Sequence, residues 1–148
     1  IAGVDHINKN IYDKAIAKSG ASVKVLYNQT YNLLKNSNAA IVTSGTATLE
    51  TALIGTPQIV CYVTNSLNMF LAKLFVKINF ISLVNLILNK EVVKELIQSD
   101  FNKEMIKTEL NLILKGKRNQ IQKDYKDLRN LLKGDKIETK IVNHIINN

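Results

Sequence analysis

The sequence predicts an α/β fold: a Rossmann-like parallel sheet flanked by helices and followed by a helical tail. In the first half, short runs rich in Val, Ile and Ala alternate with helix-like segments, as in a parallel sheet covered on both faces. In the second half, apolar residues recur every three or four positions, which is typical of amphipathic helices. With 148 residues and 46% hydrophobic content, the chain can form a globular domain with a core.

The expected elements of the first half follow one another closely. We expect strands at 1–4, 23–27, 39–43 and 58–62, with helices at 8–18, 30–36 and 46–54 between them. Gly20 and Gly55 follow the first and third of these helices, where a helix C-cap favours glycine. The single cysteine, Cys61, lies in the last strand. We expect it to be a small core residue in a reducing compartment, since one cysteine excludes a disulfide framework.

The second half shows no convincing strand after Tyr62. We expect helices at 66–77, 91–98, 102–115, 119–133 and 136–147, while 79–88 is ambiguous because it is short and broken by Asn85. This pattern divides the chain into a Rossmann-like region at 1–98 and a helical tail at 99–148. The tail is expected to pack on the same domain or on a partner subunit.

Charge and composition exclude several classes of function. The net charge is +8, which suits an anionic substrate or surface. Only Arg118 and Arg129 are arginines, and there is no zinc-ligand spacing and no RNP-like aromatic motif, so we expect no nucleic-acid binding. His6 and His144 have no partner at catalytic spacing and are expected at the surface.

The longest apolar tract, at 69–88, is too interrupted to cross a bilayer. Lys73, Lys77 and two asparagines break it, whereas a membrane span needs about 20 nearly uninterrupted apolar residues. The chain also opens with IAGVD and no methionine, so we expect a piece of a longer protein.

A small, hydroxyl-rich corner separates the strand at 39–43 from the helix at 46–54. Ser44, Gly45 and Thr46 lie there, beyond the carboxyl end of a parallel strand, where ligands of such sheets bind. A helix start offers unpaired N–H groups to phosphate, glycine permits close approach, and the hydroxyls add donors. The alternative is that Ser44 or Thr46 only caps the helix.

Glu50 adds a carboxylate one turn beyond this corner. A capping box requires Ser or Thr three residues before the acid, but Ala47 stands there, so capping does not explain Glu50. A carboxylate at this position can accept hydrogen bonds from two neighbouring ribose hydroxyls. The alternative is a solvated acid that the helix dipole favours.

Three motifs together resemble those of one enzyme family. TSGTATLETALIGTPQIVCY at 43–62 resembles the nucleotide-binding segment of lipid-A-disaccharide synthases, inverting glycosyltransferases of the GT-B fold. NMFLAKLFVKINFISLVNLIL at 68–88 resembles the family stretch F-x-x-A-K-x-x-V-K…S-L-P-N-L, with Val84 where the family usually has Pro. EVVKELIQ at 91–98 resembles the segment V-x-E-L-L-Q. The resemblance covers about 39–98.

The resemblance implies a reaction without metal or cofactor. The family joins UDP-2,3-diacylglucosamine to lipid X, which releases UDP and forms the β-1,6 disaccharide of lipid A. The implied UDP-binding residues are Ser44, Gly45, Thr46, Glu50, Asn85 and Gln98. The first three would face the diphosphate, Glu50 the ribose, and the last two the nucleotide or the sugar.

The resemblance also identifies the chain as most of the UDP-binding C-terminal half, with 1–98 as its nucleotide-sugar-binding region. The resemblance implies that the chain begins after the first strand and helix of that half. It also places the catalytic base in the N-terminal half, so no catalytic residue is assigned here. For Asn85 the alternative is a turn-forming asparagine, and for Gln98 an ordinary surface residue.

The predicted helix at 66–77 is apolar around nearly its whole circumference, with two lysines on a polar strip. We interpret it as a contact with an anionic membrane surface; the alternative is a buried helix. The expected contact residues are Leu67, Phe70, Leu71, Lys73, Leu74 and Lys77. The implied location is peripheral, on the cytoplasmic side of the inner membrane, and exchange of the tail between subunits would give a homodimer.

Two other classes of function stay open. One is another UDP-sugar transferase or epimerase of the GT-B fold. The SLVNL and ELIQ segments argue against it, because they lie outside the shared nucleotide site. The other is a non-enzymatic domain that binds a nucleotide or a membrane surface.

Overall fold

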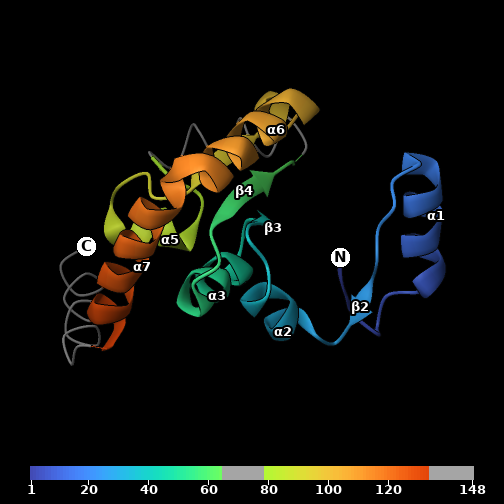
Figure 1. Cartoon of the computed structure of the whole chain (residues 1–148), viewed down its shortest axis with the longest axis horizontal. Helices are drawn as coiled ribbons and strands as arrows, with labels where there is room; N and C mark the ends of the chain where they lie inside the picture. Colours follow the sequence, from blue (N-terminus) through green and yellow to red (C-terminus); the bar gives the residue numbers. More distant parts are fainter. Residues whose placement is uncertain (65–78, 134–148) are drawn as a thin grey trace. The chain divides into compact units, whose positions relative to one another are not determined.

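The computed structural model describes residues 1–64 and 79–133, which form two compact units that divide between Ser37 and Asn38. Each unit contains a parallel sheet and helices (Figure 1), which confirms the predicted α/β class. The helices expected at 66–77 and 136–147 lie outside the described residues, and so do all six expected membrane contacts and His144. No helix of the described residues is long and apolar enough to cross a membrane.

The first unit is a small βαβα arrangement. Its elements are β1 (Ala2–Gly3), α1 (Lys9–Ser19), β2 (Leu26–Tyr27) and α2 (Thr30–Lys35). The two strands are parallel, with Ala2 opposite Leu26. The Tyr12 hydroxyl accepts a hydrogen bond from Val4 N at 3.2 Å, which holds α1 near β1. Gly20 ends α1 with φ 64°, as predicted for a C-cap.

The second unit carries a three-stranded parallel sheet in the order β3-β4-β5. Its elements are β3 (Ala40–Thr43), α3 (Thr46–Ile54), β4 (Gln58–Tyr62), α5 (Leu83–Leu88), β5 (Lys94–Ile97), the 3₁₀ turn η1 (Gln98–Asp100), α6 (Lys103–Leu112), the π-helical turn η2 (Ile113–Lys117) and α7 (Arg118–Lys133). Ala40 lies opposite Gln58, and Ile59 opposite Lys94.

The prediction for 91–98 was wrong. The segment was expected to be a helix, but Lys94–Ile97 is a strand paired with β4 and a 3₁₀ turn follows it. Val92, Val93 and Leu96 fit one face of a helix in the sequence. In the structure they are buried, at 8% exposure or less. Pairing of this segment with β4 therefore outweighs its weak local preference for a helix. The ambiguous 79–88 segment contains α5, and Val84 is buried in it.

The core lies around β4, which is buried on both faces. Gln58, Ile59, Val60 and Cys61 are all at most 6% exposed, as a central parallel strand requires. Cys61 is therefore a core residue, as predicted, and burial raises the pKa of its thiol.

The long helices pack on this same unit. α6 contacts β4 and β5, and α7 contacts α3 and α5; Figure 1 shows α6 and α7 following one another past β4. The predicted apolar stripe of α7 is confirmed, since Ile121, Tyr125 and Leu128 are buried. The boundary expected after Gln98, between the nucleotide-sugar-binding region and the helical tail, stays a prediction.

Candidate functional site

The carboxyl edge of the three-stranded sheet brings together four of the predicted site residues, Ser44, Gly45, Thr46 and Gln98. Ser44 follows β3, Thr64 lies just beyond β4, and Gln98 follows β5. Because the strands are parallel, these positions meet at one edge. Ser44 N donates to Cys61 O at 3.0 Å, and Gln98 Nε2 donates to Thr64 O at 2.7 Å. The edge is thus held together by contacts between the strand ends.

The start of α3 is open to solvent and has no side-chain cap. Gly45 is its N-cap residue and has no side chain that could cap the helix, so neither Ser44 nor Thr46 occupies the N-cap position. Gly45 and Thr46 are exposed. The N–H groups of the first turn are the ones that an α-helix leaves without backbone partners, so this corner can present donors to an anion.

Gly45 is required by its backbone conformation. Its φ of 148° and ψ of −166° lie in a region that only glycine adopts at low cost. A Cβ at this position would meet nothing within 4 Å. Backbone conformation, and not crowding by the described residues, therefore selects glycine at this position.

Ser44 differs from the expectation that both hydroxyls are donors to a ligand. Its Oγ donates to Ile81 O at 3.0 Å. A serine hydroxyl has one proton, so that proton is already used. Ser44 instead joins the corner to the segment that precedes α5. Glu50 lies exposed on α3, one turn beyond the corner, as predicted.

Asn85 is completely buried, and its amide is used inside the protein. Its Nδ2 donates to Val93 O and Glu95 Oε1, both at 2.8 Å. Its Oδ1 accepts from Val92 N at 2.8 Å and Val93 N at 3.0 Å. These four bonds tie α5 to the start of β5. They favour the structural alternative, while a contact with nucleotide or sugar stays a prediction.

Gln98 also holds backbone. Besides the bond from its Nε2, its Oε1 accepts from Thr64 N at 3.4 Å, so the side chain clasps Thr64 at both polar backbone atoms. Gln98 is half-buried with φ 53°. It is therefore not an ordinary surface residue, although its contact with a ligand stays a prediction.

The sequence analysis missed Glu95. Its carboxylate accepts hydrogen bonds from Ile81 N and Ser82 N, both at 2.9 Å, and from Asn85 Nδ2. On the expected helix it would have been a solvated acid. The available signal was an acid between apolar residues in VVKELI, because alternation along a strand places its side chain on the opposite face from Leu96.

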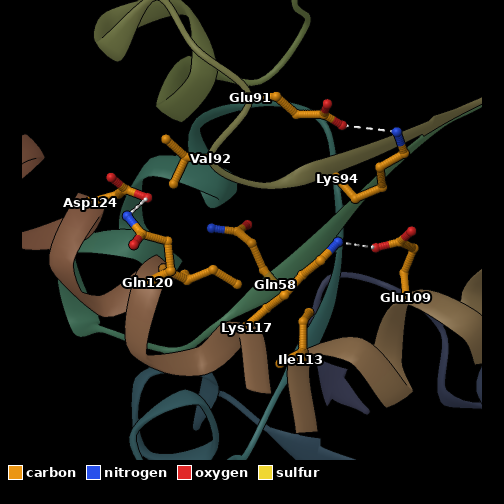
Figure 2. Close-up of a pocket in the computed structure, with 10 residues that line it drawn as sticks. Gln58, Glu91, Val92, Lys94, Glu109, Ile113, Lys117, Gln120 and Asp124 are labelled. Carbon is orange, nitrogen blue, oxygen red and sulfur yellow. Dashed lines mark hydrogen bonds and ion pairs between the residues drawn. The ribbon is translucent and has the colours of Figure 1, made fainter. Parts of the chain in front are cut away.

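A cavity of about 310 Å³ lies at the opposite, amino edge of the sheet, where Gln58 begins β4 and Lys94 begins β5. Figure 2 shows Gln58 among the residues that line it. The lining residues are Gln58, Glu91, Val92, Lys94, Glu109, Ile113, Lys117, Gln120, Ile121 and Asp124.

Charges around this cavity are paired with one another. Lys94 lies 2.9 Å from Glu91, and Lys117 lies 3.3 Å from Glu109. The hydrogen bond to Glu91 raises the pKa of Lys94. The Oε1 of Gln58 is buried and has no hydrogen-bond partner among the described residues. Ligands of parallel sheets bind beyond the carboxyl ends, so this cavity is not our nucleotide site.

The family comparison agrees with the corner at the carboxyl edge. Residues 4–145 match the model of the lipid-A-disaccharide synthetase family. The chain belongs to this family. The match spans the β3–α3–β4 corner and the segments around Asn85 and Gln98, so the resemblance inferred from the three motifs is confirmed.

Curated relatives carry the same family name. The lipid-A-disaccharide synthase of Syntrophus aciditrophicus is 40% identical over 112 residues, which cover 74% of this chain and 29% of that protein. The synthase of Wigglesworthia glossinidia brevipalpis is 42% identical over 96 residues, covering 65% and 25%. That of Blochmanniella pennsylvanica is 40% identical over 110 residues, covering 72% and 28%. The chain thus spans less than a third of these synthases.

Proposed function

We propose that this chain is the UDP-binding part of a lipid-A-disaccharide synthase. The complete enzyme would transfer diacylglucosamine from UDP-2,3-diacylglucosamine to lipid X, form the β-1,6 disaccharide and release UDP. The observation that carries the proposal is the uncapped start of α3 at the carboxyl edge. It offers backbone donors and a partial positive charge where a diphosphate needs them.

Different residues of the corner would bind different parts of the nucleotide. The backbone at Gly45 and Thr46 would bind the diphosphate, with the Thr46 hydroxyl as a further donor. Glu50, one turn along α3, would accept hydrogen bonds from the ribose hydroxyls. Ser44 would shape the corner, since its proton is held by Ile81 O. Asn85 would hold the start of β5 in place, and Gln98 would support the carboxyl edge, where it would lie near the sugar.

Other parts of the proposal rest on the sequence and the family. The general base would lie outside this chain, in the part of the synthase that the chain does not span. The segment at 66–77 would contact an anionic membrane surface on the cytoplasmic side of the inner membrane, where acylated substrates reside. The tail at 99–148 would contact a second copy of the chain.

Titration of the isotope-labelled chain with UDP tests the proposal. We expect a dissociation constant near millimolar, about −4 kcal/mol, with chemical-shift changes centred on residues 44–50. ADP and anionic vesicles serve as comparisons. Selectivity for UDP supports the transferase, whereas vesicle binding without nucleotide binding would favour the non-enzymatic class. Shift changes confined to residues far from the corner would contradict this site.

A further inference from the structure

Glu95 is a hub of hydrogen bonds beside the corner. Its Oε2 accepts from Ile81 N, and its Oε1 accepts from Ser82 N and Asn85 Nδ2. The distances are between 2.8 and 2.9 Å, as in charge-assisted bonds. Every one of these partners is an N–H donor. An ionised carboxylate, which only accepts, is therefore the group that satisfies all of them.

The segment that Glu95 holds is also bound to the corner. Ile81 is fixed at both polar backbone atoms, since its N–H donates to Glu95 and its carbonyl accepts from Ser44 Oγ at 3.0 Å. The next residue, Ser82, is buried, and its Oγ accepts from Asn85 N at the start of α5. The path of the chain before α5 is thus set by Glu95 on one side and by Ser44 on the other.

Through these contacts the Glu95 carboxylate is connected to the start of α3, where the diphosphate is proposed to bind. Ser44 directly precedes Gly45, and its hydroxyl points where Ile81 O lies. Ile81 in turn lies where Glu95 holds its N–H. A displacement of Ile81 would break the hydrogen bond from Ser44 Oγ to Ile81 O and let Ser44, and with it the backbone of the adjoining Gly45, change position.

We propose that Glu95 is a positioning residue of the nucleotide site, which acts through Ile81 and Ser44 on the part of the corner that meets the diphosphate. The inference rests on the proposed function. It predicts a specific pattern: loss of Glu95 weakens UDP and inorganic pyrophosphate equally, because both ligands carry the diphosphate. Loss of Glu50 weakens mainly UDP.

The test uses Glu95→Gln, which preserves size but turns an NH₂ group toward N–H donors. We expect the dissociation constants of UDP and of pyrophosphate to rise by a similar factor, roughly fivefold to tenfold. NMR titrations of the folded protein measure both dissociation constants from the initial slopes of the chemical-shift changes. Glu91→Gln is the matched control, since Glu91 is an exposed acid whose described bond is to Lys94, and it should change neither constant.

A double-mutant cycle separates positioning from plain structural support. If Glu95 acts through Ser44, Glu95→Gln should add little to the loss of affinity that Ser44→Ala already causes. A variant that is less stable but binds both ligands with unchanged constants would overturn the inference. Additive effects of the two substitutions would also overturn it. Failure of the unsubstituted chain to bind UDP and pyrophosphate would overturn the proposed function and this inference together.

A second measurement needs no substitution and holds even if Glu95→Gln does not fold. Coupling between two sites is reciprocal. Pyrophosphate binding at the corner should therefore stabilise the Glu95 bonds and slow hydrogen exchange of the Ile81 and Ser82 amides by several-fold. Unchanged exchange at both amides in the presence of saturating pyrophosphate would contradict the coupling.

Discussion

The two edges of the three-stranded sheet differ in how their polar groups are satisfied. At the carboxyl edge, α3 begins without a side-chain cap, Gln98 holds the backbone of Thr64, and Glu95 holds the segment that precedes α5. At the amino edge, a cavity is lined by lysines that pair with acids. The charges that line the cavity are therefore already paired with one another, whereas the exposed first turn of α3 presents backbone N–H groups that an anion can bind.

This difference separates two roles that a polar residue can have. Charges paired with each other leave little for a ligand, and an exposed pair such as Lys94–Glu91 contributes at most about 1 kcal/mol to stability. Backbone N–H groups at an exposed helix start can form hydrogen bonds with water, so leaving them without a protein partner costs little free energy. They remain able to bind an anion. The comparison predicts that substitutions at the carboxyl edge change ligand binding and that those at the amino edge change stability.

The largest expected effect concerns catalysis and asks whether the carboxyl edge is a complete active site. The chain alone should not form disaccharide, because glycosyl transfer needs a base at the acceptor hydroxyl, worth about 10²–10⁴ in rate, and we place that base outside the chain. Orientation of both substrates in a closed cleft adds several kcal/mol more. UDP release from UDP-diacylglucosamine and lipid X in detergent measures turnover.

The control for this experiment is the separately made N-terminal half of the synthase, tested alone and mixed with the chain. Activity that appears only on mixing would support the division of labour. Turnover by the chain alone would show that the carboxyl edge supplies the base as well as the nucleotide site.

The next effect comes from a pair of glycines, one near each edge. Gly45→Ala forces a side chain into a conformation that costs about 1–3 kcal/mol, so we expect lower stability and UDP binding weakened at least tenfold. Gly116 lies in the π-helical turn beside the cavity, and a Cβ there meets nothing within 4 Å. Gly116→Ala should keep UDP affinity and stability, or raise stability slightly. Equal loss of affinity in both would contradict the comparison.

These edges were predictable from the sequence to different degrees. The β3–α3–β4 corner could be predicted because its apolar runs are broken by glycines, and both Gly45 and Gly55 have positive φ in the structure. Chain order and parallel pairing then place Ser44 at the carboxyl edge, whereas Gln98 could not be placed there because 91–98 was predicted to be a helix. The corner could therefore be found with no knowledge of side-chain contacts.

The supporting contacts could not be found in this way. β5 was missed because Val92, Val93 and Leu96 fit a helix and a strand equally well, and pairing with β4 decides between them. Once that strand is assigned to a helix, Glu95 becomes a surface acid and its bonds to Ile81 and Ser82 are invisible. Residues that act through contacts with distant parts of the chain can be predicted only once the strand topology is known.

Glu50 gives the third prediction, which tests how the carboxyl edge divides the nucleotide. Glu50→Gln should weaken UDP by about tenfold, since charge-assisted bonds to ribose contribute about 1.5–3 kcal/mol. Pyrophosphate, which has no ribose, should bind almost unchanged. Glu91→Gln at the amino edge is the control in the same titrations. Equal weakening of both ligands would mean that Glu50 only tunes the local electrostatic field.

The smallest effect belongs to the amino edge and concerns Tyr125, which is completely buried and bonded to Gln58 at 3.2 Å. Burial raises the pKa of its phenol far above the usual value. The folded state therefore keeps a proton that the unfolded state loses above about pH 10.

Stability should fall as pH rises above this value, because the unfolded chain binds fewer protons than the folded chain. For one group the slope approaches about 1.4 kcal/mol per pH unit. Tyr125→Phe should lower stability near pH 7 but remove this part of the slope, as urea unfolding between pH 8 and 11 would measure. Tyr31→Phe is the control, since Tyr31 is 57% exposed. UDP affinity of the folded Tyr125→Phe variant should stay unchanged at pH 7. A tenfold loss of affinity would mean that residues at the amino edge also contribute to UDP binding.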